Sequence, residues 1–172
     1  MQLAPEIAAA AQMMIDCLRG GGLVAFCGNG GSAADSQHLS GELISRFRRE
    51  RAAFRGLALT TDTSILTAIG NDYGYEKVFA RQVQGLMSEG DLLVLISTSG
   101  KAENCLVAVE MARSLGVKTL ALTGATGGEL AACVDLCLRV PSSDTPRIQE
   151  AHITIGHIIC DLVEAALAGE TA

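Results

Sequence analysis

The sequence lacks several features that would define its class. It contains no tryptophan, and aromatic residues make up only 3% of its 172 residues. No apolar stretch approaches the ~18 residues of a transmembrane helix. The opening segment MQLAPEIAAAAQMMIDCLRGGG has no basic start, so it predicts a helix rather than a signal peptide. We therefore expect a cytoplasmic protein with no membrane partner.

An excess of positive charge is also absent. The formal net charge is −6, which argues against a surface that binds nucleic acid through its phosphate groups. The sequence thus predicts no nucleic-acid partner. An anionic substrate would have to be captured locally, against the field of the whole chain.

The cysteines include no C-x-x-C pair. Cys133 and Cys137 are four residues apart, but no second pair is present that could complete a metal site with them. All the cysteines stand among apolar residues, so we expect reduced core side chains in a reducing compartment. They are Cys17, Cys27, Cys105, Cys133, Cys137 and Cys160.

Glycine and short apolar runs are abundant instead. The 19 glycines indicate tight turns, and helical segments separate the apolar runs. The predicted strands are 23–26, 56–60, 91–97, 118–122 and 136–140. The predicted helices are 4–18, 32–47, 63–69, 76–87, 102–115, 128–133 and 146–168.

Short apolar strands with helices between them indicate a parallel sheet that is covered on both faces. We therefore predict an α/β fold, a three-layer αβα sandwich with about five parallel strands. Residues 1–172 are expected to form a single domain. Residues 1–20 are expected to be an N-terminal helix that packs on this domain or on an oligomer core.

The stretch CGNGGSAADSQHLSGEL follows the first predicted strand, where ligands of such sheets bind. Residues 28–33 match G-x-G-x-x-A, a weak form of the dinucleotide fingerprint. That fingerprint also needs an acidic residue about 20 positions later, and the first acidic residue that ends a strand is Asp62, well beyond that spacing. A Walker loop closed by Lys-Ser or Lys-Thr is absent too. The dinucleotide interpretation is therefore weakened.

A second loop, Ser97-Thr98-Ser99-Gly100-Lys101, follows the third predicted strand and precedes a helix. Three successive hydroxyls and a helix N-terminus favour a bound anion. The alternative is an ordinary N-cap, which needs only one hydroxyl. We predict a phosphate site here.

His38 and Glu42 are four residues apart on the predicted helix 32–47, so they share one face. Such a pair can bind a metal or act as a base with its orienting partner, although a surface ion pair is the simpler alternative. The predicted C-terminal helix carries Gln149 and His157 among isoleucines. A histidine in such surroundings is often only a core residue.

Five stretches, in this order, resemble a known family over nearly the whole chain. They are GNGGSAADSQHLSGEL, LTAIGNDYGYE, ISTSGKAEN, ALTGATGGELA and RIQEAHITIGHIICDLVE. The chain is similar to the sugar isomerase (SIS) domain family, whose fold is flavodoxin-like. The resemblance implies an aldose–ketose isomerase that acts on a phosphorylated seven-carbon sugar in lipopolysaccharide heptose synthesis. It also implies a homotetramer.

The resemblance assigns roles to particular residues. One Zn²⁺ per subunit would be held by His38, Glu42, Gln149 and His157. Glu42 and His157 would be the catalytic acid and base, with Glu42 the favoured base and His152 structural. Substrate contacts are expected at Asn29, Gly30, Gly31, Ser32, Glu42, Arg46, Asn71, Asp72, Ser97, Thr98, Ser99 and Gln149.

Some positions leave alternatives open. Gly-Asn-Asp at residues 70–72 is also common turn chemistry. Arg48, Arg49 and Arg51 are expected to be solvated, unlike Arg46. Ala102 stands where relatives often place a further hydroxyl, so the phosphate loop lacks one donor, and Lys101 is either a charge for the phosphate or a solvent-facing side chain.

The spacing of Gln149 and His157 raises a geometric difficulty. Eight residues on a straight helix span about 12 Å, whereas ligands of one zinc ion with bonds of ~2.0–2.2 Å must lie much closer together. A bent helix or a second subunit would relieve this conflict. We therefore predict a site at a subunit interface.

Two other kinds of SIS protein are alternatives to an enzyme. One is a non-catalytic partner protein, similar to the homologues that bind the replication initiator DnaA. Such homologues tend to lose the later acid and base positions, which are present here as Glu42, Gln149 and His157. The other is a sugar-phosphate-sensing regulator, a class that usually carries an added DNA-binding domain.

Overall fold

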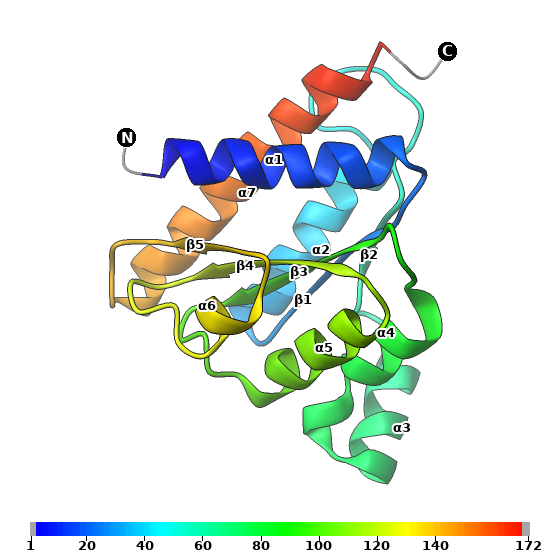
Figure 1. The fold of residues 1–172 in the computed structure, drawn as a ribbon, viewed down its shortest axis with the longest axis vertical. Coiled ribbons are helices and arrows are strands. Elements are labelled where there is room, and N and C mark those ends of the chain that lie inside the picture. The colour runs from blue at the N-terminus through cyan, green and yellow to red at the C-terminus, as the bar shows by residue number, and fades with distance from the viewer. Residues whose placement is uncertain (1–2, 170–172) are drawn as a thin grey trace.

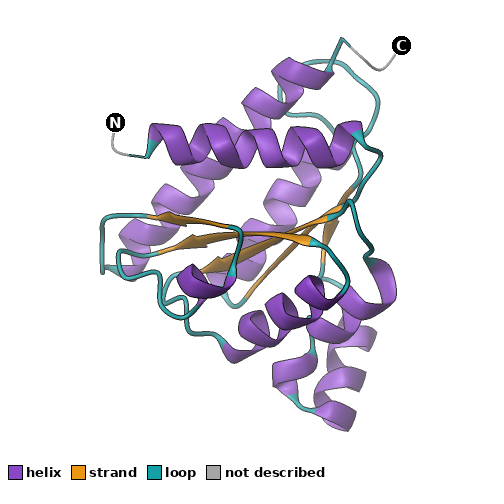
Figure 2. Ribbon diagram, viewed as in Figure 1, coloured by secondary structure: helices purple, strands orange, loops and turns teal. Residues whose placement is uncertain are grey.

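The computed structural model describes residues 3–169. A sheet of five parallel strands in the order β2-β1-β3-β4-β5 lies between two layers of helices (Figures 1 and 2). This arrangement confirms the predicted three-layer α/β fold.

Most elements begin and end within two or three residues of their predicted bounds. The strands are β1 (Val24–Gly28), β2 (Gly56–Ala58), β3 (Leu92–Ser97), β4 (Lys118–Thr123) and β5 (Leu136–Arg139). The helices are α1 (Ala4–Arg19), α2 (Gly31–Ile44), α3 (Thr63–Tyr73), α4 (Ala80–Leu86), α5 (Glu103–Ser114), α6 (Leu130–Cys133) and α7 (Thr145–Leu167), with a 3₁₀ turn, η1, at Tyr75–Lys77.

Alternation along the strands divides the core into two clusters. Val24 and Phe26 of β1 pack with α1, α2 and α7, whereas Ala25 and Cys27 pack with α4 and α5 on the other face. This follows from the strand period of two residues, which sends successive side chains to opposite faces. Figure 1 shows α1, α2 and α7 on one side of the sheet and α3 to α6 on the other.

The two predicted ligand loops meet at one edge of the sheet. Gly28 at the end of β1 is in register with Ile96 near the end of β3. Because the strands are parallel, the loop after β1 and the loop after β3 leave the sheet side by side. The sheet therefore brings together two segments about 70 residues apart in sequence.

The segment after α2 differs from its prediction. The helix ends at Ile44 rather than at residue 47, and the following segment is irregular. The prediction that Arg51 is solvated is wrong, because its side chain is 1% exposed and bonded to Glu164. The side chains of Arg48 and Arg49 are 67% and 44% exposed, in agreement with the prediction that they are solvated.

The expectation that the cysteines are core side chains holds for four of the six, which are buried. All six cysteines are free, and Cys133 and Cys137 are the two that are only partly buried. Across residues 3–169, no helix combines the length and the apolar character needed to span a bilayer.

Candidate functional site

Three side chains from α2 and α7 converge into one cluster. His38 Nε2 lies 3.1 Å from Glu42 Oε1 and 3.1 Å from His157 Nε2. The three possible ligand atoms all lie within 4.8 Å of one another, and among residues 3–169 no other such group of His, Cys, Asp or Glu is found. The side chains of His38 and Glu42 are 46% and 22% exposed, so the cluster is open to solvent.

The donor set of this cluster suits a zinc ion. Imidazole nitrogens and carboxylate oxygens are common zinc ligands, and in a tetrahedral site such atoms lie ~3.4 Å apart. Two of the separations in the cluster are close to that value. A fourth position would remain for a further ligand or for substrate, as catalytic zinc sites require.

Helices α2 and α7 approach closely enough to form the cluster because Gly156 of α7 lies against Leu39 of α2. A Cβ atom added to Gly156 would lie 2.5 Å from a Leu39 methyl carbon. Gly156 and Leu39 are the direct neighbours of His157 and His38. The glycine thus lets the two histidine rings come to a centroid separation of 4.9 Å.

Gln149 lies elsewhere in the same chain. A Cβ on Gly31 would lie 3.0 Å from the side-chain amide carbon of Gln149, so this amide rests on the glycine loop. Gly31 and His38 are seven residues apart on α2, which corresponds to about 10 Å along the helix. Within one subunit, Gln149 therefore sits beside the first loop and not beside the His38 cluster, and its role as a metal ligand stays a prediction.

The glycine loop is held by an amide pair that the sequence did not reveal. Asn29 and Asn104 exchange two hydrogen bonds of 2.9 Å between their side-chain amides. The Tyr75 hydroxyl also donates to Asn29 Oδ1 at 3.2 Å. Ser32 is buried just after the loop, at 3% exposure. Neither residue was a predicted site residue, although Asn104 lies in the stretch ISTSGKAEN and Tyr75 lies in the stretch LTAIGNDYGYE.

The hydroxyl loop after β3 does not cap α5. The N-cap residue is Ala102, and no side-chain capping hydrogen bond is present at the start of this helix. Instead, Ser97 and Ser99 accept hydrogen bonds of 3.2 Å from the amides of Gly100 and Lys101. Capping therefore does not explain the hydroxyls, and the first-turn amides of α5 have no side-chain partner, as an anion site requires.

A cavity of about 280 Å³ opens beside this loop. Its polar lining comes from Thr98, Ser99 and Lys101 of this loop, from Thr126 after β4, and from Ser142, Ser143 and Thr145 at the start of α7 and just before it. Ser142, Ser143 and Thr145 were not predicted because no motif connects the stretch SSDT to the hydroxyl loop in the sequence. They line the same cavity as the predicted phosphate loop with further hydroxyl groups.

Asn71 and Asp72 lie in α3 and not in a turn. Their side chains are exposed and bonded to each other, Asn71 Nδ2 donating to Asp72 Oδ1 at 2.7 Å. None of the residues of α3 is buried. Arg46 is also exposed, and its nearest ionic partner is Glu50 at 3.6 Å. Among residues 3–169, no hydrogen bond or ion pair links the side chains of these three residues to His38, Glu42 or His157.

The pKa values of two titratable side chains near the site differ from their ordinary values. Burial raises the pKa of Asp35, one turn before His38, and the nearby His38 opposes this shift. Burial lowers the pKa of His152, whose Nε2 lies 3.1 Å from the Thr123 carbonyl oxygen. His152 is 1% exposed, which agrees with the structural role expected for it.

Comparison with known proteins identifies many close relatives. Phosphoheptose isomerase of Rhodospirillum rubrum is 57% identical over 164 residues, which are 95% of this chain and 87% of the relative. Phosphoheptose isomerase of Akkermansia muciniphila is 53% identical over 167 residues, 97% of this chain and 88% of the relative.

Solved structures agree with the sequence relatives. Phosphoheptose isomerase from Neisseria gonorrhoeae superposes with a TM-score of 0.90 at 45% identity, over 95% of this chain and 87% of that one. The enzyme from Francisella tularensis gives 0.91 at 45% identity, over 94% and 86%. The Vibrio vulnificus NanR protein shares only the fold, with 15% identity and a TM-score of 0.63, over 96% of this chain and 55% of that one.

Residues 1–124 match the family description "SIS domain". This match contains both ligand loops and the helix that carries His38 and Glu42. Together with relatives at more than half identity across nearly the whole chain, it places the chain in the SIS domain family, in agreement with the resemblance of its five sequence stretches.

Proposed function

We propose that the chain is an aldose–ketose isomerase that converts D-sedoheptulose 7-phosphate to D-glycero-D-manno-heptose 7-phosphate. This would be the first step towards ADP-heptose and the heptose of the lipopolysaccharide core. The relatives at 53–57% identity, all named phosphoheptose isomerase, support this substrate. The observation within the chain that carries the proposal is the convergence of Glu42, His38 and His157 on one open cluster.

The loop after β3 would hold the phosphate group. The hydroxyls of Ser97, Thr98 and Ser99 and the free amides at the start of α5 would donate to its oxygens. Anchoring the phosphate fixes the far end of the open-chain sugar, which reduces the freedom of its reacting end. Asn29, Gly30, Gly31, Ser32 and Gln149 would then contact the rest of the sugar at the first loop.

Glu42 would act as the base of the reaction. Its carboxylate takes the proton from C1, which lies next to the C2 carbonyl, and an enediol forms. His157 moves the proton between the two oxygens, and Glu42 returns its proton to C2. One proton leaves a carbon and one arrives, so the step needs no redox cofactor.

The cluster would also hold one zinc ion per subunit. His38, Glu42 and His157 supply donors that fit zinc, and Gln149 is the proposed fourth ligand. When bound, the ion would supply Lewis-acid polarisation of the sugar oxygens.

The protein would assemble as a cytoplasmic homotetramer with its site at a subunit interface. Two surfaces support this assembly. Helix α3 buries none of its residues and leaves Ile65 37% and Tyr73 47% exposed. Between α1 and α7, an apolar groove includes Ile158 and Leu162, which are 43% and 42% exposed. A neighbouring subunit would bring Gln149, Arg46, Asn71 and Asp72 to a site that one chain leaves without them.

The proposal is tested by assaying the purified protein with sedoheptulose 7-phosphate and following the aldose product. We expect turnover that is lost on dialysis against a chelator and regained with Zn²⁺. Metal analysis should find about one ion per chain before dialysis and no ion after it. Absence of conversion by the zinc-loaded protein would refute the substrate, and full activity without metal would refute the role of zinc.

A further inference from the structure

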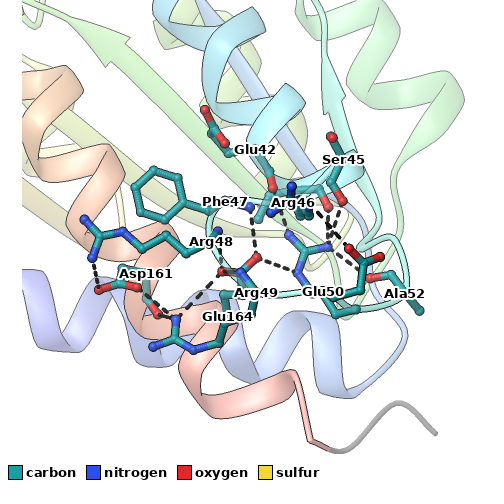
Figure 3. Close-up of polar contacts among 12 residues, drawn as sticks. Glu42, Ser45, Arg46, Phe47, Arg48, Arg49, Glu50, Ala52, Asp161 and Glu164 are labelled. Carbon is teal, nitrogen blue, oxygen red and sulfur yellow. Dashed lines mark hydrogen bonds and ion pairs between the residues drawn. The ribbon is translucent and has the colours of Figure 1, made fainter.

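A buried carboxylate on α7, that of Glu164, is hydrogen-bonded to several residues of the irregular segment that follows α2. Glu164 lies two turns after His157, and its side chain is 1% exposed. It accepts hydrogen bonds of 2.9, 2.7 and 2.8 Å from the successive backbone amides of Phe47, Arg48 and Arg49 (Figure 3). Burial opposes its ionisation, but these amides and Arg51 outweigh burial and hold the pKa of Glu164 below its ordinary value.

Arg51 connects this carboxylate to the end of α2. Its Nε donates to Glu164 Oε1 at 3.1 Å, and its terminal nitrogens donate to the carbonyl oxygens of Glu42 at 2.8 Å and Leu43 at 2.9 Å. Those carbonyls have no partner within the helix, since the last turn of any helix leaves them free. A buried guanidinium therefore caps α2 at the residue that carries the catalytic carboxylate.

The same segment reaches the other half of the site. The ring of Phe47 lies 5.3 Å from the ring of His157, at an angle of 30°. The backbone amide of Phe47 is one of the three that Glu164 holds. Glu164 thus fixes the neighbour of His157 directly and the backbone of Glu42 through Arg51.

We propose that Glu164 and Arg51 are positioning residues of the isomerase site, which lock α2 against α7 so that Glu42 and His157 face the same substrate carbons. The inference rests on the proposed function. Its physical basis is the sensitivity of proton transfer to distance, since a displacement of ~1 Å at a reacting group can cost about 100-fold in rate.

Asp91 provides a matched comparison. It is 7% exposed and accepts hydrogen bonds of 2.7 Å from the amides of Leu23 and Ser88. It precedes β3, so it lies at the opposite end of the strands from the site. Asp91 is therefore a buried backbone anchor of the same kind that does not touch the site.

The first test compares Glu164→Gln with Asp91→Asn. The glutamine NH₂ cannot accept a hydrogen bond, so at least one of the three amides loses its partner. We expect kcat to fall about 10- to 100-fold with KM changed by less than about threefold. Asp91→Asn should lower the unfolding midpoint, measured by thermal denaturation, but leave kcat within about twofold at temperatures where it is folded.

The second test does not depend on activity. The chain has only three histidines, so imidazole NMR resonances can be assigned by single substitutions. In Glu164→Gln, the His157 resonances should move because the Phe47 ring shifts beside them, whereas those of buried His152 should stay. In Asp91→Asn all three should match the wild type, with the metal content equal in every sample.

Arg51→Lys covers the case in which Glu164→Gln does not fold. Lysine keeps the charge beside Glu164 but cannot also span the carbonyls of Glu42 and Leu43, so kcat and the His157 resonances should change in the same way. Asp161→Asn is the local control, because Asp161 pairs only with the exposed side chains of Arg48 and Arg49 and the carboxylate holds no amide.

The outcomes separate the two proposals. If Arg51→Lys, and Glu164→Gln where it folds, keep kcat within about threefold of Asp91→Asn with unmoved His157 resonances, then Glu164 only supports the fold and the inference fails. If the wild-type protein does not isomerise the sugar phosphate, the proposed function fails, and the histidine spectra still decide whether Glu164 and Arg51 position the site.

Discussion

Helices α2 and α7 differ from α3 in how they use their polar residues. The first two pack on the sheet and on each other, and they bring His38, Glu42 and His157 within 4.8 Å. Helix α3 buries none of its residues, and within residues 3–169 the side chains of Asn71 and Asp72 are hydrogen-bonded only to each other. Packing within one chain therefore brings one half of the proposed site together, whereas we propose that a neighbouring subunit supplies the other half.

The largest effect on turnover is expected from a substitution in the cluster between α2 and α7. Glu42→Gln should lower turnover by about 10² to 10⁴-fold, because general-base catalysis contributes that much and glutamine cannot take up the proton. Binding of the sugar phosphate, measured by calorimetry, should stay close to that of the wild type. Near-normal turnover would contradict the assignment of Glu42 as base.

Glu110→Gln is the matched control for this variant. Glu110 is an exposed carboxylate on α5, on the opposite face of the sheet from α2 and α7. Its substitution removes the same charge without touching the cluster. A loss of turnover in this variant as large as in Glu42→Gln would mean that net charge, and not Glu42 itself, is responsible.

The difference between the two regions also explains what could be predicted from the sequence. The strands and helices were predicted because apolar periodicity is local, and the spacing of His38 and Glu42 places them on one face of α2 whatever the helix packs against. The family resemblance supplied His157, which the sequence pattern alone left as a core histidine.

Contacts between distant residues could not be read in this way. Arg51 was expected in solvent because an arginine-rich run is normally solvated, but its partner Glu164 stands 113 residues later. Asn29 meets Asn104 across 75 residues. Burial of these polar groups depends on the pairing of α2, α7 and the two loops, which no local pattern encodes.

A smaller effect is expected from α3. Replacing Asn71 and Asp72 by alanine should raise KM about tenfold, the value of roughly one hydrogen bond to a substrate hydroxyl, with little change in kcat. The decisive measurement uses mixed assemblies in which this double variant is co-expressed with Glu42→Gln. A site that combines α2 of one chain with α3 of another can then hold all of its residues.

The mixed assemblies should therefore contain a fraction of sites with the wild-type KM. The double variant alone, assayed at the same concentration, is the control and should show a single raised KM. If the mixture also shows only the raised KM, then α3 serves the site of its own chain, and the proposed division of the site between subunits is wrong.

The smallest effect is expected in the stability of the fold at low pH. It distinguishes Glu164, the buried carboxylate of α7, from the exposed side chains of α3. The native fold keeps Glu164 ionised to lower pH than the unfolded chain does, because its pKa is lowered by the amides and Arg51 in spite of burial. As the pH falls below the ordinary value of 4.5, the unfolded chain therefore takes up this proton first. The stability that Glu164 contributes is then lost progressively.

Denaturant unfolding of the wild type and of Glu164→Gln, at a series of pH values from 7 down to about 3, measures this contribution. The wild type should be the more stable at neutral pH, and the gap between the two proteins should narrow on acidification, with a difference in slope of at most one proton per chain. A gap that stays constant would mean that Glu164 stabilises the fold without its charge. That result would remove the ionised carboxylate as the reason that three amides and a buried arginine gather beside the site.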